Sequence, residues 1–413
     1  MRACVFSHSY VVAANHAKLE RLARVRGVEL SLVCPRRIRR QFGLYPVQRT
    51  HHPDYAIVPL RTVYSSHNYR FFYLGAGRAL GRLAPDLLHV EEEPWSLAAW
   101  QALRYRRRRP GLKLVVFTWE NLRRAHGFPH ERIERAVLAA ADAAIAGNAE
   151  AAAILREKGF ERPIRVIPQF GIDPAAYAPR DESALRAQLG LRGLVIGFAG
   201  RLVPEKGLGL LLDVLASLSA PQHPSWSLLV IGGGPLRAEL ARRFAAASLA
   251  GRAVLVDTVP HGEMPRYLNC MDILVLPSVA AAHWKEQFGH VLIEAMACQV
   301  PVIGSTCGEI PNVVGDAGVT FPEGDAGALR QALLRLMASP DERAELAARG
   351  RKRVIQHYTD ERIAQATLEV WRVRVGLWLD PPPSPSLRGR GVQLGEDEDD
   401  EDTGGGWLDV SRC

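Results

Sequence analysis

Short runs of apolar residues recur along this chain, and segments with apolar residues at helical spacing lie between them. One series of runs ends before residue 170, and a second series begins at residue 194. Apolar runs that alternate with helices are typical of parallel strands buried on both faces of a sheet. The expected strands are Ala3–Phe6, Glu29–Cys34, Leu87–Val90, Leu112–Thr118, Ala143–Ala146 and Ile164–Ile167, then Leu194–Ala199, Ser227–Ile231, Ala253–Val256, Ile273–Leu276, Val300–Ile303 and Val319–Phe321.

Two similar series of strands and helices predict an α/β protein with two Rossmann-like, doubly wound domains. The expected helices include His16–Arg26, Glu131–Ala141, Leu208–Leu218, Leu236–Ala247 and Phe288–Ala297. Turn-forming residues between Gly171 and Pro179 separate the two series and mark a linker. The predicted parts are an N-terminal domain (1–172), a linker (173–190), a C-terminal domain (191–359), a final helix (360–380) and a disordered acidic tail (381–413).

Charge is distributed unevenly along the 413 residues. The tail beyond residue 380 carries eight acids and three arginines, so the rest of the chain has a net charge of +13, against +8 for the whole. A body this basic favours anionic partners such as phosphorylated substrates, acidic lipid surfaces or nucleic acid.

The spacing of the cysteines and the N-terminal sequence indicate the cellular compartment of the protein. None of the six cysteines forms a Cys-x-x-Cys pair, so we expect buried free thiols rather than zinc sites or disulfides. The N-terminus has no signal-peptide pattern, and no run of about 18 apolar residues occurs. We therefore expect a cytoplasmic protein.

Two loops of the second series carry candidate phosphate-binding groups. Arg201 and Lys206 lie in the loop that follows Leu194–Ala199, at the strand edge where α/β proteins bind ligands. Guanidinium and ammonium groups both bind phosphate oxygens, although the same pattern suits solvated surface cations. Gly232, Gly233 and Gly234 follow the next strand and permit close backbone approach, or form a plain tight turn.

The segment from Glu286 to Cys298 is the strongest candidate site. A helix that starts near Phe288 directs its free amides and positive dipole end towards an anion. Glu286 precedes this start and Glu294 lies about 12 Å further on, at 1.5 Å per residue. Two carboxylates at this separation can bracket a nucleoside diphosphate sugar. Glu294 sits among apolar residues, and a charge in such surroundings needs a partner.

Five motifs of the second half occur in a fixed order along the chain. They are Gly-Arg-Leu-x-x-Glu-Lys-Gly (200–207), Gly-Gly-Gly-Pro (232–235), Glu-Gln-Phe-Gly-x-x-x-x-Glu-Ala-Met-Ala (286–297), Pro-Val-Ile-Gly-Ser (301–305) and Gly-Glu-Ile-Pro (308–311). Together they resemble glycosyltransferase family 4. That family has the GT-B fold and transfers sugars from nucleoside diphosphate donors with retention of configuration. The resemblance extends over about residues 3–377 and is most specific in the C-terminal half.

The resemblance implies a role for each matching residue. Arg201 and Lys206 would hold the donor diphosphate, and Glu286 would meet hydroxyls of the transferred sugar. Glu294 would contact the ribose, and the amides of Gly289, His290 and Val291 would contact the distal phosphate. The turn at Gly233 would also contact the donor, and the backbone from Thr258 to Pro260 would contact the base.

The N-terminal half departs from the family pattern at two places. Many members carry a glycine pair after the first strand, where this chain has Ser7, His8, Ser9 and Tyr10. Many also carry a histidine at the strand tip that here reads Thr118, Trp119, Glu120 and Asn121. We take His8, Tyr10, Trp119, Glu120 and Asn121 as candidates for the acceptor side.

No Asp-x-Asp follows a strand of the body, so we expect transfer without a metal or other cofactor, with the cations and the helix dipole stabilising the leaving group. The expected partners are a nucleotide-sugar donor and a glycan or lipid-linked acceptor, as in polysaccharide, glycolipid or cell-envelope synthesis. One alternative is a nucleotide-sugar epimerase or hydrolase on the same fold.

The arginine run from Arg104 to Arg109 leaves further alternatives open. The run suits a solvated face, or a patch that contacts the anionic inner face of a membrane. It also prompts a nucleic-acid-binding protein, with Tyr105 as a stacking group, although no recognition module is matched.

Overall fold

The computed structural model describes residues 1–40, 43–48, 54–63, 70–218, 224–245 and 249–375. The first sheet has seven parallel strands in the order β11-β10-β9-β8-β1-β2-β5. Its strands are β1 Arg2–Phe6, β2 Glu29–Pro35, β5 Ala56–Leu60, β8 Leu87–Val90, β9 Lys113–Thr118, β10 Ala143–Ala146 and β11 Ile164–Val166. Two antiparallel pairs accompany it, β3 Arg37–Arg40 with β4 Gly43–Pro46 and β6 Thr62–Val63 with β7 Phe72–Tyr73.

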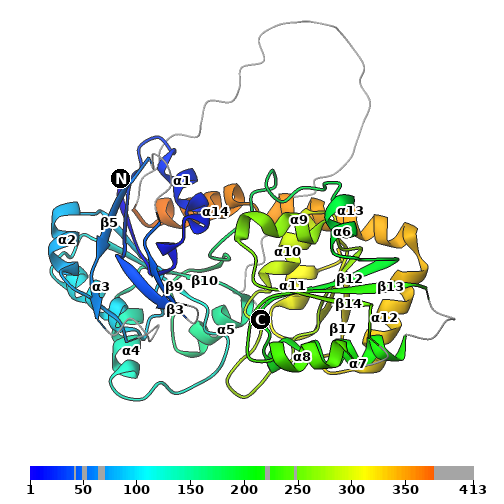
Figure 1. The fold of residues 1–413 in the computed structure, drawn as a ribbon. Coiled ribbons are helices and arrows are strands. Elements are labelled where there is room, and N and C mark those ends of the chain that lie inside the picture. The colour runs from blue at the N-terminus through cyan, green and yellow to red at the C-terminus, as the bar shows by residue number, and fades with distance from the viewer. Residues whose placement is uncertain (41–42, 49–53, 64–69, 219–223, 246–248, 376–413) are drawn as a thin grey trace, which may run out of the picture. The chain divides into compact units, whose positions relative to one another are not determined.

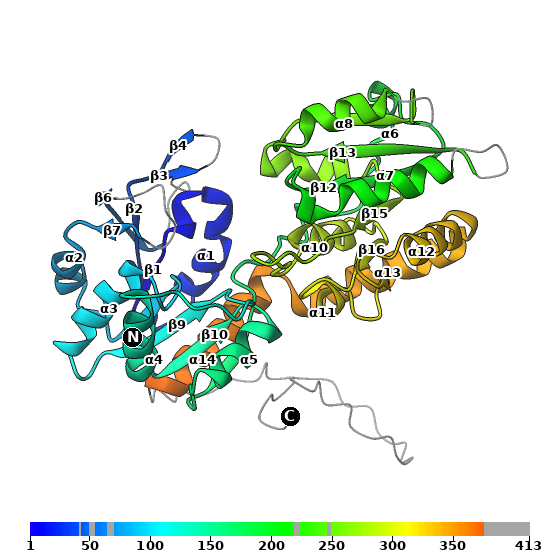
Figure 2. The same cartoon turned by 90° about the horizontal axis from the view of Figure 1, so that it is seen from below.

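Helices cover both faces of the first sheet, as its continuous apolar strands require. The elements are η1 Ser9–Val11, η2 Ala13–His16, α1 Ala17–Ala23, α2 Ala76–Leu83, α3 Leu97–Arg107, α4 His130–Ala140 and α5 Ala149–Glu157. Apolar residues of α2, α3, α4 and α5 form one buried cluster with the strands, and α1 belongs to the cluster on the other face. Figure 2 shows α3 and α1 on opposite sides of β1.

The second sheet has six parallel strands in the order β14-β13-β12-β15-β16-β17. Because β12 and β15 are neighbours, the order reverses direction beside β12, which is where doubly wound sheets bind ligands. The strands are β12 Leu194–Ala199, β13 Trp226–Ile231, β14 Ala253–Val256, β15 Ile273–Leu276, β16 Val302–Ser305 and β17 Val319–Phe321.

Helices also cover both faces of the second sheet, and Figure 1 shows α7, α8 and α12 on one side with α10 and α11 on the other. The bounds are α6 Ser183–Gln188, η3 Pro204–Lys206, α7 Leu208–Ser217, α8 Arg237–Phe244, η4 His261–Glu263, α9 Met264–Leu268, α10 His290–Ala297, α11 Ile310–Val314, α12 Ala326–Ala338 and α13 Pro340–His357. None of the described helices is both long and apolar enough to cross a bilayer.

The last helix, α14 (Asp360–Val375), returns to the first sheet. Ile363, Leu368 and Trp371 are buried in the same cluster as α1, and Trp371 has no exposed surface. Just before α14, Thr359 pairs with Ile172 of the segment that joins the two sheets. The chain therefore passes between the sheets twice, along two segments that lie side by side.

Most differences from the sequence prediction occur in the first half. Strand β5 was missed because its run contains Pro59 and is only partly buried, while the pair β3 and β4 is rich in arginine. Five of the six cysteines are buried free thiols, as predicted. Cys413 and the predicted acidic tail lie outside the described residues.

Candidate functional site

All donor-side candidates from the sequence lie at one edge of the second sheet or on the helix that starts there. Because its strands are parallel, their carboxyl ends meet at this edge. Thr258 and Pro260 follow β14, Gly233 follows β13, and Lys206 follows β12. The loop after β15 then carries Glu286 and leads into α10.

Lys206 and Glu286, which are 80 residues apart in sequence, form a partly buried ion pair. The Lys206 Nζ lies 2.5 Å from Glu286 Oε2, with side chains 13% and 8% exposed. The Ser278 hydroxyl donates to the same carboxylate oxygen at 3.0 Å. The Lys206 ammonium also lies over the Trp284 ring, 5.1 Å from its centroid. A fixed cation and a fixed carboxylate thus stand together at the carboxyl edge, the first suited to bind an anionic group and the second to accept a hydrogen bond from a hydroxyl.

Gly207 fixes the backbone beside Lys206. Its φ of +67° is in the left-handed region, and a Cβ there would lie 1.8 Å from the Pro277 carbonyl oxygen. Only glycine permits this approach of the β12 loop to the end of β15. Arg201, on the same loop, is exposed, and no ion pair joins it to another of the described residues. Its guanidinium is thus available to a ligand.

The N-terminus of α10 offers unsatisfied amides beside this pair. Gly289 precedes the helix with φ +79° and no side-chain cap, so the amides of His290 and Val291 have no capping acceptor. Burial lowers the pKa of His290 to about 4, so its imidazole is neutral at pH 7. The helix end therefore carries its own dipole without an additional protonated histidine.

Glu294 lies one turn into α10, where its side chain contacts Tyr177. Burial is the main cause that raises the pKa of Glu294 to about 7, and the Tyr177 side chain hydrogen-bonds to it. The Tyr177 hydroxyl also lies 3.3 Å from the His261 ring. Tyr177 is the partner that the apolar setting of Glu294 required.

The first sheet brings a run of three glutamates to the carboxyl end of β8, which the sequence reasoning missed. Glu92 accepts from the backbone amide of His8 and contacts the His8 Nδ1, both at 2.6 Å. The Tyr73 hydroxyl donates to Glu92 at 3.1 Å. His8 is thereby fixed at the edge of the sheet. Acids directly after a buried strand were the signal that could have revealed this run.

Glu91 is the centre of a buried polar cluster. It accepts hydrogen bonds from the Lys18 ammonium at 2.5 Å, the Tyr10 hydroxyl at 2.7 Å and the Gln169 amide at 2.9 Å. Burial raises the pKa of Glu91, but the charges and hydrogen bonds of Lys18, His89 and Gln169 together outweigh it, so the pKa lies below its ordinary value. Tyr10 has no exposed surface, so the structure places it in support of Glu91 rather than on the surface of the site.

The three acceptor-side candidates after β9 have different surroundings. Trp119 packs its ring on Gly147 and donates from Nε1 to Gln169 at 3.1 Å. Glu120 is buried beside Arg124 and His126. The Asn121 side chain donates to the backbone oxygen of Glu286 at 3.2 Å, so it reaches the donor-side loop.

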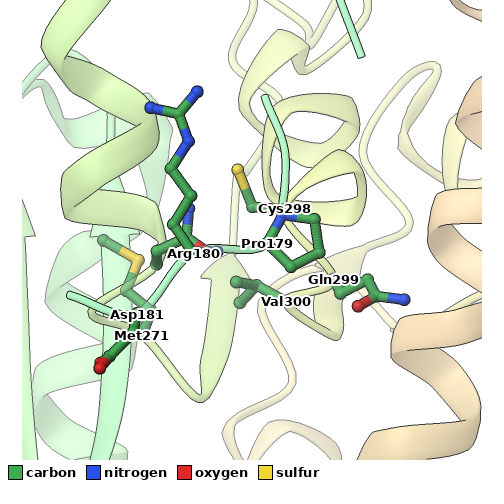
Figure 3. Close-up of a pocket in the computed structure, with 8 residues that line it drawn as sticks. Pro179, Arg180, Asp181, Met271, Cys298, Gln299 and Val300 are labelled. Atoms are coloured by element: carbon green, nitrogen blue, oxygen red, sulfur yellow. The ribbon is translucent and has the colours of Figure 1, made fainter. Parts of the chain in front are cut away.

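The hollow in Figure 3 lies at the opposite edge of the second sheet. It measures about 440 Å³ and is lined by Pro179, Arg180, Asp181, Asn269, Met271, Cys298, Gln299 and Val300. Met271 and Val300 precede β15 and β16, so this hollow faces the amino ends of the strands and contains none of the candidate residues. Within the described residues, no group of three or more His, Cys, Asp or Glu residues is arranged to hold a metal.

Two family descriptions match the chain, one in each half. Residues 15–175 match the family described as Glycosyltransferase Family 4, and residues 181–353 match Glycosyl transferases group 1.

Two curated relatives cover parts of the chain. The alpha-maltose-1-phosphate synthase of Mycolicibacterium smegmatis is 31% identical over 58% of this chain and 65% of its own length. The 2-deoxystreptamine glucosyltransferase of Streptomyces kanamyceticus is 33% identical over 47% of this chain and 46% of its own length. The chain thus spans less than two thirds of either relative.

Solved structures extend the similarity of fold to nearly the full length. Sucrose-phosphate synthase from Thermosynechococcus elongatus has a TM-score of 0.69 at 22% identity, covering 90% of this chain and 98% of that one. Anabaena HepE in complex with UDP has a TM-score of 0.70 at 18% identity, covering 90% and 100%.

Proposed function

This chain belongs to glycosyltransferase family 4 and has the GT-B fold, and on that premise we propose that it transfers a sugar, with retention of configuration, from a nucleoside diphosphate sugar to a hydroxyl acceptor. The observation that carries the proposal is the meeting of Lys206, Ser278 and Glu286 at the strand edge beside the N-terminus of α10.

Each part of this arrangement suits one part of the donor. An ammonium has three protons, and Lys206 gives one to Glu286, so it can also donate to the diphosphate. The amides of His290 and Val291 at the helix start suit the distal phosphate. Glu286 and Glu294 carry oxygens that can accept from sugar and ribose hydroxyls.

In the proposed reaction, the bond between the anomeric carbon and the phosphate oxygen breaks, and its electron pair leaves with the diphosphate. Lys206, Arg201 and the α10 dipole stabilise that developing charge. The acceptor oxygen forms its bond to the anomeric carbon on the same face, and its proton passes to the departing phosphate oxygen. Retention follows because entry and departure share one face.

We also propose that this transfer needs no metal ion. The positive charge that a divalent cation supplies to a leaving diphosphate in other enzymes is available here from Arg201, Lys206 and the helix dipole. Activity that is unchanged by EDTA supports this part of the proposal, and activity restored only by Mg²⁺ or Mn²⁺ would overturn it.

The test is product analysis with UDP-, GDP- and ADP-linked sugars, starting with UDP because HepE is solved with UDP-glucose. The first acceptors are a polyol phosphate, an aminocyclitol and a lipid-linked sugar. The proposal expects a glycosylated acceptor and free nucleoside diphosphate, with α-linked product from an α-linked donor. An epimerised donor, or free sugar alone, would instead support the epimerase or hydrolase alternative.

Nucleic acid is a weaker alternative in view of the structure. Tyr105 was the stacking group of the arginine run, and it is buried, with its hydroxyl donating to the Leu80 carbonyl at 2.9 Å. A salt-dependent filter-binding signal with single-stranded nucleic acid would revive this alternative.

We further propose peripheral contact of the first sheet's helices with an anionic membrane at the cytoplasmic face. Phe128 is 81% exposed and lies at an apolar hollow between α3 and α4. Arg107 and Arg132 line the same hollow. Further arginines on α3 or just after it are also exposed, namely Arg104, Arg108 and Arg109. An aromatic side chain amid cations suits a headgroup region, where each arginine adds about 1 kcal/mol.

Sedimentation with phosphatidylglycerol vesicles at low salt tests this contact. Phe128→Ser should weaken sedimentation, while Ile355→Ser, an exposed apolar residue on α13, serves as the matched control. A wild-type chain that stays in the supernatant would remove the membrane proposal.

A further inference from the structure

The backbone on both sides of the Glu286 carboxylate is held by side chains from the first sheet. Asn121 follows β9 and Asn148 follows β10, yet each donates a hydrogen bond to the loop before α10. We propose that Asn121 and Asn148 are positioning residues that set the orientation of Glu286, so that the acceptor-side sheet controls the donor-side acid. This inference rests on the proposed function, since it assigns Glu286 to the donor sugar.

Asn121 holds the carbonyl of Glu286 itself. Its Nδ2 donates to the Glu286 backbone oxygen at 3.2 Å, and the Glu309 amide donates to the same oxygen at 3.2 Å. Gly308, with φ +58°, lets the chain pass this oxygen, because a Cβ there would lie 2.0 Å from it. Asn121 is buried, so water does not replace its hydrogen bond without a change in packing.

Asn148 holds the next carbonyl and is itself fixed at both ends of its amide. Its Oδ1 caps α5 by accepting from the Ala151 amide at 2.7 Å, and its Nδ2 donates to the Gln287 backbone oxygen at 3.1 Å. The side chain has no exposed surface. Because the Asn148 oxygen is bound to α5 and its NH₂ group to Gln287, this side chain fixes the position of the Gln287 loop relative to α5.

The reverse contact completes the connection. The Gln287 Nε2 donates to the Trp119 backbone oxygen at 3.0 Å. The Lys285–Glu150 ion pair also joins the loop to α5, but both side chains are about a third exposed, so it contributes little. The two asparagines therefore provide the buried side-chain hydrogen bonds from the first sheet to the carbonyls of residues 286 and 287.

The consequence concerns the carboxylate. With the carbonyls of Glu286 and Gln287 both fixed, the Glu286 side chain leaves a fixed backbone towards Lys206 and Ser278. The proposed nucleotide contacts lie instead at the α10 amides, at Glu294 and at the backbone from Thr258 to Pro260, to which neither asparagine hydrogen-bonds. Loss of either amide should therefore lower the rate of transfer and leave nucleotide binding nearly unchanged.

Asn148→Asp separates this role from helix capping. Aspartate caps a helix as well as asparagine does but has no amide to donate to Gln287. Asn148→Ser also keeps a cap, and its shorter side chain has no amide to reach the Gln287 oxygen; Asn121→Asp removes the other amide donor. Asn269→Asp is the matched control, because its Nδ2 donates to the Ala178 and Pro265 carbonyls at the opposite edge of the second sheet.

The measurements are kcat for transfer, Kd for free UDP, and kcat in an E286Q background. We expect kcat to fall about five- to tenfold in each donor-removing variant, as for loss of one buried hydrogen bond, with Kd within about twofold of wild type. Because the asparagines act through Glu286, the same substitutions should cause no further loss in E286Q.

Three results would overturn the inference. They are an unchanged kcat in N148D and N148S, a loss of equal size in the E286Q background, and a matching loss in N269D. A wild-type chain that transfers no sugar would overturn the proposed function along with it, whereas an active wild type with any of these three results removes the positioning role alone.

Discussion

Replacing Lys206 with methionine removes the positive charge of the partly buried pair and keeps most of the side-chain volume. Two effects follow from the geometry. The leaving diphosphate loses a preorganised donor, which costs about 10²- to 10³-fold in kcat, or about 2.7–4 kcal/mol of transition-state stabilisation. The Glu286 carboxylate also loses its cation while it is only 8% exposed.

The second effect can be measured separately from the first. Removing one partner of a buried pair destabilises a fold by about 3–5 kcal/mol, because the remaining charge is uncompensated. K206M should therefore lower the free energy of unfolding in urea at pH 7 by about 3 kcal/mol. In K206M/E286Q the uncompensated charge is gone, so most of that stability should return while kcat stays at least about 10²-fold below that of wild type.

Initial rates and urea unfolding of wild type, K206M, E286Q and K206M/E286Q form the complete assay. A K206M enzyme that transfers sugar within about threefold of the wild-type rate would refute the role of the ammonium at the leaving group. A double variant no more stable than K206M would refute the reasoning about the uncompensated carboxylate.

Two further predictions concern pH and packing. Burial raises the pKa of Glu294 from 4.5 to about 7 in the folded state. Protonated Glu294 therefore stabilises the fold at low pH, and this contribution is lost as the pH rises from about 4.5 to 7. Over that rise, the melting temperature of Glu294→Gln should fall less than that of wild type. Trp371 has no exposed surface where α14 packs on the first sheet, so Trp371→Ala should lower the free energy of unfolding by about 3–5 kcal/mol in urea titrations, and a loss below about 1 kcal/mol would contradict that packing.

Strand positions followed from the sequence wherever a run was apolar throughout. The predicted bounds of β8, β10, β12, β14, β15 and β17 agree with the structure. Burial on both faces explains the simple pattern of β8, β10, β12 and β15, whereas β14 and β17 are partly buried edge strands. Helix α10 begins at His290 rather than at the predicted Phe288, because Gly289 takes a left-handed conformation that a helix interior does not.

The site was only partly accessible from sequence. Lys206 and Glu286 were each placed at the carboxyl edge, but their direct pairing depends on how two loops fold over the strand ends. Asn121 was expected on the acceptor side, yet it reaches the Glu286 backbone. Glu92, which fixes His8, was missed because the sequence of a short acidic run does not show which of its carboxylates is buried.

The central claim is that the carboxyl edge of the second sheet holds the donor diphosphate, and a crystal structure with an intact nucleoside diphosphate sugar tests it most directly. We predict phosphate oxygens about 3 Å from Lys206 Nζ and from the amides of His290 and Val291. A donor bound at the opposite edge, in the hollow beside Met271 and Val300, would contradict it.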